Sequence, residues 1–382
     1  MAQRDQASAC VLKFLLPTLA RWYLSVRRII FVPAFLLPAG LMLTLDLPPG
    51  AEAATTVTEA SVSLPAKGLE EFRTDPHARE SQGNQISGVV RDIFADRRGS
   101  LWFGTQDGIG RHDGASLTYF DIRDRFDQGL TVRAITEDGV GHVWFGTTGG
   151  VIRYDGKSFT TYDSDDGLRS DDVWSLFVDR AGLLWIGTIA GVSTFDGSRF
   201  TSFELPAGTP DPNKGVSSEQ IVWCILEDRQ SRLWFAGEGA VFVYDGDAVS
   251  RIHLMDAETV TYAGGIAEDP SGVLWLTSSK GLLRCDGNAF ARVELPEVLQ
   301  EVGLGVPYAD SHGNLWFSAN GVGVCRYDGT SVRIFSAEDG MTSGAIHVTR
   351  EDRQGRIWCS GWMGAFRLDG ERFVNVTRAG PW

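Results

Sequence analysis

Seven tryptophans recur at nearly constant intervals, and this repeat limits the possible folds more than any other feature of the chain. They are separated by 42, 41, 49, 41, 41 and 42 residues. An aspartate lies six positions before each one, and an Asp-Gly pair follows eleven or twelve positions after it. A period of about 40–45 residues indicates radially or linearly repeated units. The seven residues are Trp102, Trp144, Trp185, Trp234, Trp275, Trp316 and Trp358.

Turn chemistry divides each unit into four short strands. An apolar run such as 173–179 (VWSLFVD) ends at the aspartate of a D-x-x-G turn, and the strand with the tryptophan follows. A Gly-rich turn then leads to a third strand, and Asp-Gly closes a hairpin into a fourth. Four strands per unit is the pattern of a propeller blade, with the tryptophans as wedges between blades. We therefore predict an all-β chain with a single seven-bladed β-propeller of four-stranded antiparallel blades over residues 86–382.

The N-terminal region is expected to be an export signal. Residues 29–45 are apolar and uncharged, basic residues precede them, and Ala51-Glu52-Ala53 has the small-x-small form of a cleavage site. The sequence predicts a signal peptide over 1–53 and a periplasmic or secreted protein. The alternative is an uncleaved anchor at 29–45 in the inner membrane.

Residues 54–85 form a lead-in to the propeller. Leu69 and Phe72 repeat the apolar pair of the fourth strands, so the chain offers eight outer strands for seven blades. We expect residues 69–74 to latch onto the last blade beside 372–378. The alternative is that they are the remnant of a preceding blade.

Charge and cysteine content exclude several classes of function. The formal net charge is -14, which disfavours nucleic acid as a partner. The cysteines after the leader are spread at intervals of tens of residues without a C-x-x-C motif, so we expect small buried residues without disulfides or a metal site. No cofactor is predicted.

The repeat unit resembles a known family. Residues 132–168 (VRAITEDGVGHVWFGTTGGVIRYDGKSFTTYDSDDGL) are similar to the two-component regulator propeller repeat, and the similarity extends over 86–378. The resemblance implies an extracytoplasmic ligand-binding sensor region of the kind found in hybrid histidine kinases. Kinase modules do not follow in this sequence, so the resemblance implies a stand-alone binding propeller and no phosphotransfer. Streptogramin lyase propellers share a similar G-x-L-W repeat and imply an enzymatic alternative.

One variable position in the repeat is the best place to look for function, because the shared positions make the fold. It lies eleven residues before each tryptophan, where the innermost strand should begin at the entrance of the central channel. Trp faces stack on sugar rings, and Arg pairs with carboxylate or sulfate. We predict ligand binding there, possible ligands being acidic or neutral oligosaccharides. The alternative is that the Trp side chains fill inter-blade space and the Arg side chains are solvated. The position holds Arg91, Arg133, Trp174, Trp223, Gly264, Gly305 and His347, and all but the two glycines are the predicted ligand-binding residues.

Loops on the same face add further candidates. The connection 204–220 is the longest and could overhang the channel. The acidic stretch 163–172 does not match a calcium-binding loop, because its glycine falls one place early and no closing glutamate follows. The turns between second and third strands contribute Gln106, Asp107, Glu238, Lys280, Asn320 and Trp362.

The sequence gives little support for catalysis. Lyase chemistry of the streptogramin type would need two histidines and a glutamate at the channel entrance, and only His347 occupies such a position. We therefore predict a non-enzymatic sensor or binding propeller that feeds a signal-transduction system. Its expected partner is a small molecule, an oligosaccharide or a sensor kinase, and a protein-interaction platform is the alternative function.

Overall fold

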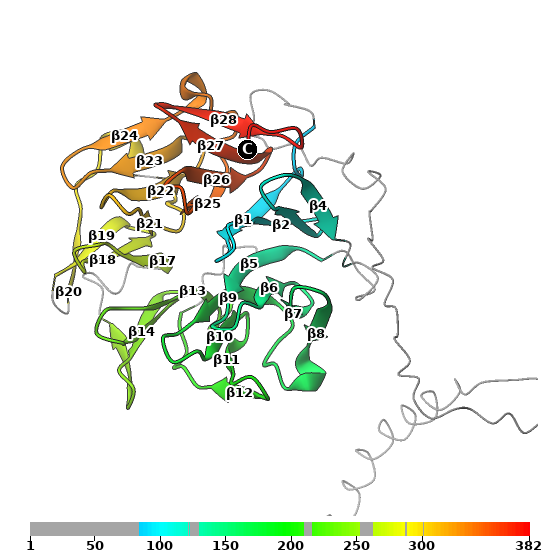
Figure 1. Cartoon of the computed structure of the whole chain (residues 1–382). Coiled ribbons are helices and arrows are strands. Elements are labelled where there is room, and N and C mark those ends of the chain that lie inside the picture. The colour runs from blue at the N-terminus through cyan, green and yellow to red at the C-terminus, as the bar shows by residue number, and fades with distance from the viewer. Residues whose placement is uncertain are drawn as a thin grey trace, which may run out of the picture. The chain divides into compact units, whose positions relative to one another are not determined.

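The computed structural model describes residues 84–120, 122, 130–209, 216–252, 263–286, 289–300 and 302–382. These residues form seven four-stranded antiparallel sheets, each built from four consecutive strands, which follow one another around a central axis (Figure 1). The innermost strands of consecutive blades lie side by side, and that of the first blade also contacts that of the last. The predicted seven-bladed propeller is confirmed. No helix among the described residues has the length and apolar character needed to cross a membrane.

The blades follow the chain in order. The first four consist of β1 (Val90–Ala95), β2 (Leu101–Thr105), β3 (Ile109–His112) and β4 (Leu117–Phe120); β5 (Val132–Glu137), β6 (Val143–Thr147), β7 (Gly150–Tyr154) and β8 (Phe159–Tyr162); β9 (Val173–Val178), β10 (Leu184–Thr188), β11 (Gly191–Phe195) and β12 (Phe200–Phe203); β13 (Val222–Glu227), β14 (Leu233–Gly237), β15 (Ala240–Tyr244) and β16 (Val249–Ile252).

The last three blades consist of β17 (Ala263–Glu268), β18 (Leu274–Ser278), β19 (Gly281–Asp286) and β20 (Ala289–Arg292); β21 (Tyr308–Ala309), β22 (Leu315–Ala319), β23 (Gly323–Tyr327) and β24 (Val332–Phe335); β25 (Ile346–Glu351), β26 (Ile357–Gly361), β27 (Gly364–Asp369) and β28 (Arg372–Val376). Among the described residues, three short 3-10 helices lie in the connections between blades: η2 (Ser164–Asp166), η3 (Glu297–Leu299) and η4 (Ala337–Asp339).

The D-x-x-G turn and the blade tryptophan form one hydrogen-bonded unit. In the fourth blade, Asp228 Oδ1 accepts the backbone N–H groups of Gln230 and Arg232, while Oδ2 accepts the indole N–H of Trp234 at 2.7 Å. The same indole bond, 2.7 to 2.9 Å long, occurs in all seven blades. The repeated aspartate thus fixes both the turn and the ring that follows it.

The tryptophans pack between blades, as the sequence predicts. Trp102 of the first blade meets Phe145 and Tyr154 of the second at centroid distances of 5.4 and 5.5 Å. Trp185 of the third blade lies 5.7 Å from Phe235 of the fourth. Edge-to-face contacts of this kind bury large apolar areas at a defined height in each boundary.

The ring closes between the last blade and the first. The backbone at Gln85 pairs with Thr377 just after β28, and Arg378 donates its backbone N–H to the Asn84 carbonyl. Beyond β28, Trp382 stacks on His112 of the first blade, with a centroid distance of 3.9 Å and an interplanar angle of 13°. The C-terminal residues therefore pack on the first blade. The predicted latch at 69–74 and the export signal at 1–53 lie outside the described residues.

Candidate functional site

The variable position identified in the sequence coincides with a β-bulge. In six blades the pairing between the first and second strands shifts register at this residue, as it does between Val90 and Asp92. A bulged residue has no partner opposite it, and the bulge redirects its side chain. The bulges therefore place variable residues on the innermost strand edge, at Arg91, Arg133, Trp174, Trp223, Gly264 and His347.

The sixth blade differs, because its innermost strand β21 pairs over only two residues. Gly305, which holds the variable position there, donates its N–H to the Ser318 carbonyl at 2.9 Å. With Gly264 in the fifth blade, one side of the channel entrance carries no side chain at this position.

Backbone hydrogen bonds show which loops surround this entrance. The first residue of the turn between second and third strands donates its N–H to a carbonyl just before the innermost strand, as Gln106 does to Val89 at 3.2 Å. Asn320 and Trp362 bond in the same way to Gly303 and Ala345. These turns and the innermost strand starts therefore share one face, which we call the mouth face.

Arg133, Trp174 and Trp223 form a continuous stack across three blades. The Arg133 guanidinium carbon lies 3.6 Å from the centroid of the Trp174 ring, which is a cation–π contact. Trp174 in turn meets Trp223 at a centroid distance of 4.7 Å and an interplanar angle of 82°. All three side chains are half-buried. The structure thus brings three of the five predicted binding residues together, and the Arg133 guanidinium covers one face of Trp174.

Asp172 fixes this stack and was missed in the sequence. Its carboxylate pairs with the Arg133 guanidinium and accepts the Trp174 indole N–H at 3.3 Å. Burial lowers the pKa of Arg133, and the charge of Asp172 opposes this effect. The guanidinium stays protonated at any physiological pH. The sequence signal that could have identified Asp172 is its position two residues before an innermost-strand tryptophan. This arrangement occurs once among the seven units.

Arg91 and His347 form a second contact, at the boundary that closes the ring. Arg91 Nη1 lies 3.2 Å from His347 Nε2, and since a guanidinium only donates, the histidine nitrogen accepts. Burial, followed by the nearby charge of Arg91, lowers the pKa of His347 to about 3. His347 is therefore neutral at pH 7.

A buried carboxylate, Asp92, follows Arg91 in the chain. Asp92 accepts backbone N–H groups from Ile93 and, in the next blade, Ile135, and its Oδ1 lies 3.3 Å from Arg350 Nη2 of the last blade. Burial raises the pKa of Asp92, while Arg350 and the two backbone bonds lower it. This carboxylate joins three blades at the closing boundary.

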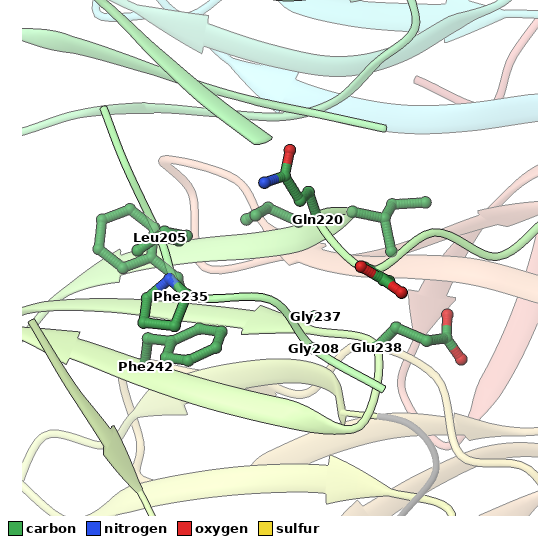
Figure 2. A pocket seen from close by; sticks show the side chains of 11 residues that line it. Leu205, Gly208, Gln220, Phe235, Gly237, Glu238 and Phe242 are labelled. Carbon is green, nitrogen blue, oxygen red and sulfur yellow. The ribbon is translucent and has the colours of Figure 1, made fainter. Parts of the chain in front are cut away.

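The long connection after the third blade covers a small cavity over the fourth (Figure 2). Leu205, Phe235 and Phe242 lie toward one end of it and Glu238, which is 1% exposed, toward the other. The cavity volume is about 10 Å³, space for roughly one water molecule. It is too small for an oligosaccharide.

One arginine holds both ends of this long connection. Arg169 donates to Glu204 Oε1 at 2.6 Å and to Gln220 Oε1 at 3.3 Å. Its Nε also donates to the Ala190 carbonyl at 2.6 Å. Residues 210–215, in the middle of the connection, lie outside the described residues.

The acidic stretch at 163–172 satisfies its own backbone. Asp163 and Asp166 form a capping box around η2, and Asp171 accepts from the Ser164 N–H at 2.7 Å. Within the part of the chain that the structure describes, no group of three or more His, Cys, Asp or Glu side chains is placed to hold a metal ion. Four cysteines are free thiols there, at Cys224, Cys285, Cys325 and Cys359.

The histidines do not converge on the mouth. His142 bonds to Asp138 in a D-x-x-G turn, His312 lies in another such turn, and His112 lies beneath Trp382. Of the histidines in the described ranges, only His347 lies at a bulge. His77 and His253 fall outside these ranges.

Comparison with known proteins agrees with the repeat and the fold. The sequence profile of the two component regulator propeller family matches residues 84–107, 167–190 and 215–239. No curated protein matches the chain in sequence. Among solved structures, the extracellular domain assigned to a hybrid two component system of B. thetaiotaomicron aligns with a TM-score of 0.62 and 22% identity. That alignment covers 76% of this chain and 40% of the other, so the chain spans less than half of that domain.

Two other solved structures share this fold but belong to proteins with different roles. A catalytically inactive virginiamycin B lyase from Staphylococcus aureus, solved with quinupristin, aligns with a TM-score of 0.59 and 15% identity over 75% of this chain and 96% of the lyase. PorZ of Porphyromonas gingivalis, a surface component of the type-IX secretion system, aligns with a TM-score of 0.58 and 15% identity over 74% of this chain and 47% of PorZ. At these identities the likeness concerns the fold alone. The chain is thus a seven-bladed propeller in which three segments match the two component regulator propeller repeat.

Proposed function

We propose that this chain is an extracytoplasmic, non-enzymatic sensor propeller that binds an oligosaccharide at the mouth face. The main support is that the variable position eleven residues before each blade tryptophan is a β-bulge on the innermost strand. There Arg133, Trp174 and Trp223 stack across three blades. Architecture does not require this cluster, because the other blades close with Arg91, His347 or glycine at the same position.

The charges of the site favour a neutral or weakly acidic sugar. The Arg133 charge is already paired with Asp172, so an incoming carboxylate would have to compete with that pair. Trp223, which meets Trp174 edge to face, offers the ring for stacking. Arg91 at the adjacent bulge supplies the second cation.

The experiment is a glycan array followed by calorimetry with the glycans that bind to the full protein. Trp223→Ala and Arg133→Ala should each weaken binding by about tenfold or more, since a stacked ring or a charged pair is worth about 1–3 kcal/mol. Lys157→Ala, in an exposed hairpin turn away from the mouth, should bind like the wild type. Unchanged affinity in both mouth variants, or no glycan bound at all, would remove the proposal.

A lyase is the second candidate, favoured by the structural match to virginiamycin B lyase. It is the weaker proposal, because a histidine with a pKa of about 3 is a poor general base at pH 7. Turnover of a streptogramin B antibiotic by the wild type, lost in His347→Gln, would reverse this ranking.

A further inference from the structure

The D-x-x-G turns also tie neighbouring blades together, through the residue that follows the aspartate. In the first blade, the backbone N–H of Arg97 donates to Glu137 Oε2 of the second blade at 2.8 Å. The Arg97 guanidinium bonds to the carbonyls of Asp138 and Gly139 in the next turn. Glu137 is largely buried, so this link is stronger than an exposed ion pair. We call it a turn staple.

The staple recurs at four further boundaries. Between the third and fourth blades Arg180 binds Glu227, and between the fourth and fifth Arg229 binds Glu268. The backbone N–H and hydroxyl of Ser311 bind Glu351 between the sixth and seventh blades. At the closing boundary Arg353 Nε donates to the Asp96 carbonyl at 2.7 Å.

Two boundaries cannot form the staple, for reasons visible in the residues themselves. Between the second and third blades the two positions hold Gly139 and Val178, which supply neither a guanidinium nor a carboxylate. Between the fifth and sixth they hold Pro270 and Ala309, and proline lacks even the backbone N–H. The innermost strand of the sixth blade also pairs over only two residues.

The positions of these two boundaries matter for motion. They divide the ring into three blades on one side and four on the other, which is as close to opposite as seven blades allow. Apolar side chains still pack across both, around Trp144 and Val173 at one and around Trp275 and Leu315 at the other. Apolar packing is not directional, so packed elements can slide by small amounts where the turn staple is missing.

We propose that the propeller is hinged, with blades 3–5 as one arc and blades 6, 7, 1 and 2 as the other. The Arg133–Asp172 pair and the Arg133 contact with Trp174 span the unstapled boundary between blades 2 and 3 at the mouth face. They hold the two arcs together on that face. The hinge does not depend on the identity of a ligand. Movement at the hinge changes the relative positions of the two arcs and therefore the spacing of residues at the mouth face.

Pulsed electron paramagnetic resonance on the full protein tests the hinge. Nitroxide pairs at equivalent exposed hairpin turns compare three boundaries: Ala115 with Lys157, Lys157 with Ser198, and Ser198 with Asp247. Three native cysteines are buried, so Cys10→Ser and Cys224→Ser leave the introduced ones as the reactive thiols. The Lys157–Ser198 distance distribution should be roughly twice as wide as the other two.

The missing staple can then be installed. In Gly139→Arg with Val178→Glu, the Lys157–Ser198 distribution should narrow to the width of its neighbours. An added cation at residue 139 has room, since no atom lies within 4 Å of the position its Cβ would take. Gly139→Ala alone is the matched control, because it supplies neither a guanidinium nor a carboxylate, and it should leave the width unchanged. Equal widths at all three boundaries would overturn the hinge. If the double variant fails to fold, the comparison of wild-type boundaries still decides.

Discussion

The two ends of the innermost strands use the same chemistry for different purposes. At the D-x-x-G turns a carboxylate accepts a tryptophan indole N–H in every blade, with the same spacing of six residues. At the mouth face Asp172 accepts the Trp174 indole N–H in one blade only. The repeated bond builds the ring, whereas the single one positions side chains that the ring does not need. In a repeat protein, the number of copies of an interaction therefore separates architecture from function.

Removing a turn carboxylate should have the largest effect on stability. The Asp228 side chain is fully buried and accepts bonds from two backbone N–H groups, the Arg232 guanidinium and the Trp234 indole. Asp228→Ala leaves these donors unpaired, and we expect the free energy of unfolding to fall by about 3–5 kcal/mol. Asp247→Ala, in an exposed hairpin turn, is the control for urea denaturation. A loss below about 1 kcal/mol would contradict the turn's structural role.

His347 at the mouth face should make the stability of the protein depend on pH. Folding lowers the pKa of His347 to about 3, whereas an unfolded histidine titrates near about 6.5. Below that pH the unfolded chain takes up a proton that the folded protein does not, so stability is full above pH 6.5 and falls as the pH falls.

Between pH 6.5 and 5 the loss through His347 should be about 2 kcal/mol. His347→Gln keeps an acceptor for Arg91. In urea titrations at several pH values, it should remove this part of the fall in the free energy of unfolding. The turn aspartate of the fourth blade, Asp228, responds to a different pH range. Burial raises the pKa of Asp228, but the indole and other hydrogen bonds outweigh it and lower the pKa overall, so its contribution is lost only in more acidic solution. Identical slopes in wild type and His347→Gln would contradict the assignment.

One turn departs from the repeat and can be improved. Ser231 takes a φ of 61° where the other six turns hold glycine, such as Gly182 with a φ of 86°. Serine is strained in this left-handed region, so Ser231→Gly should raise the free energy of unfolding by about 0.5–1 kcal/mol. Gly182→Ala should lower it by a similar amount. Thermal unfolding measures both, and a destabilised Ser231→Gly would mean that the serine hydroxyl contact with Arg180 matters more than the strain.

The blades could be predicted from sequence because their determinants are local and occur seven times. Residues 132–162 contain all the turn residues that separate β5 to β8, and the structure places the strands between them. The variable position could also be predicted. It lies eleven residues before Trp144 and the equivalent tryptophans, and this constant spacing places it on the innermost strand.

The contacts at that position could not be predicted, because each occurs once and joins distant residues. Asp172 reaches Arg133 only after two blades have packed together. Trp382 lies beyond the last repeat, so no periodic pattern indicates that it stacks on His112. The turn staples join residues of different units, as in Arg97 and Glu137, and a pattern within one unit does not show them.

The central claim is that the D-x-x-G turns build the ring and that the mouth face does not. Two aspartates near the same blade boundary test this claim most directly. Asp138 and Asp172 each accept a tryptophan indole N–H and each lie near a cationic or imidazole group. Urea denaturation should show a loss of about 2–4 kcal/mol for Asp138→Ala and less than about 1 kcal/mol for Asp172→Ala. Equal losses would contradict the account, because the mouth would then be as much a part of the architecture as the turns.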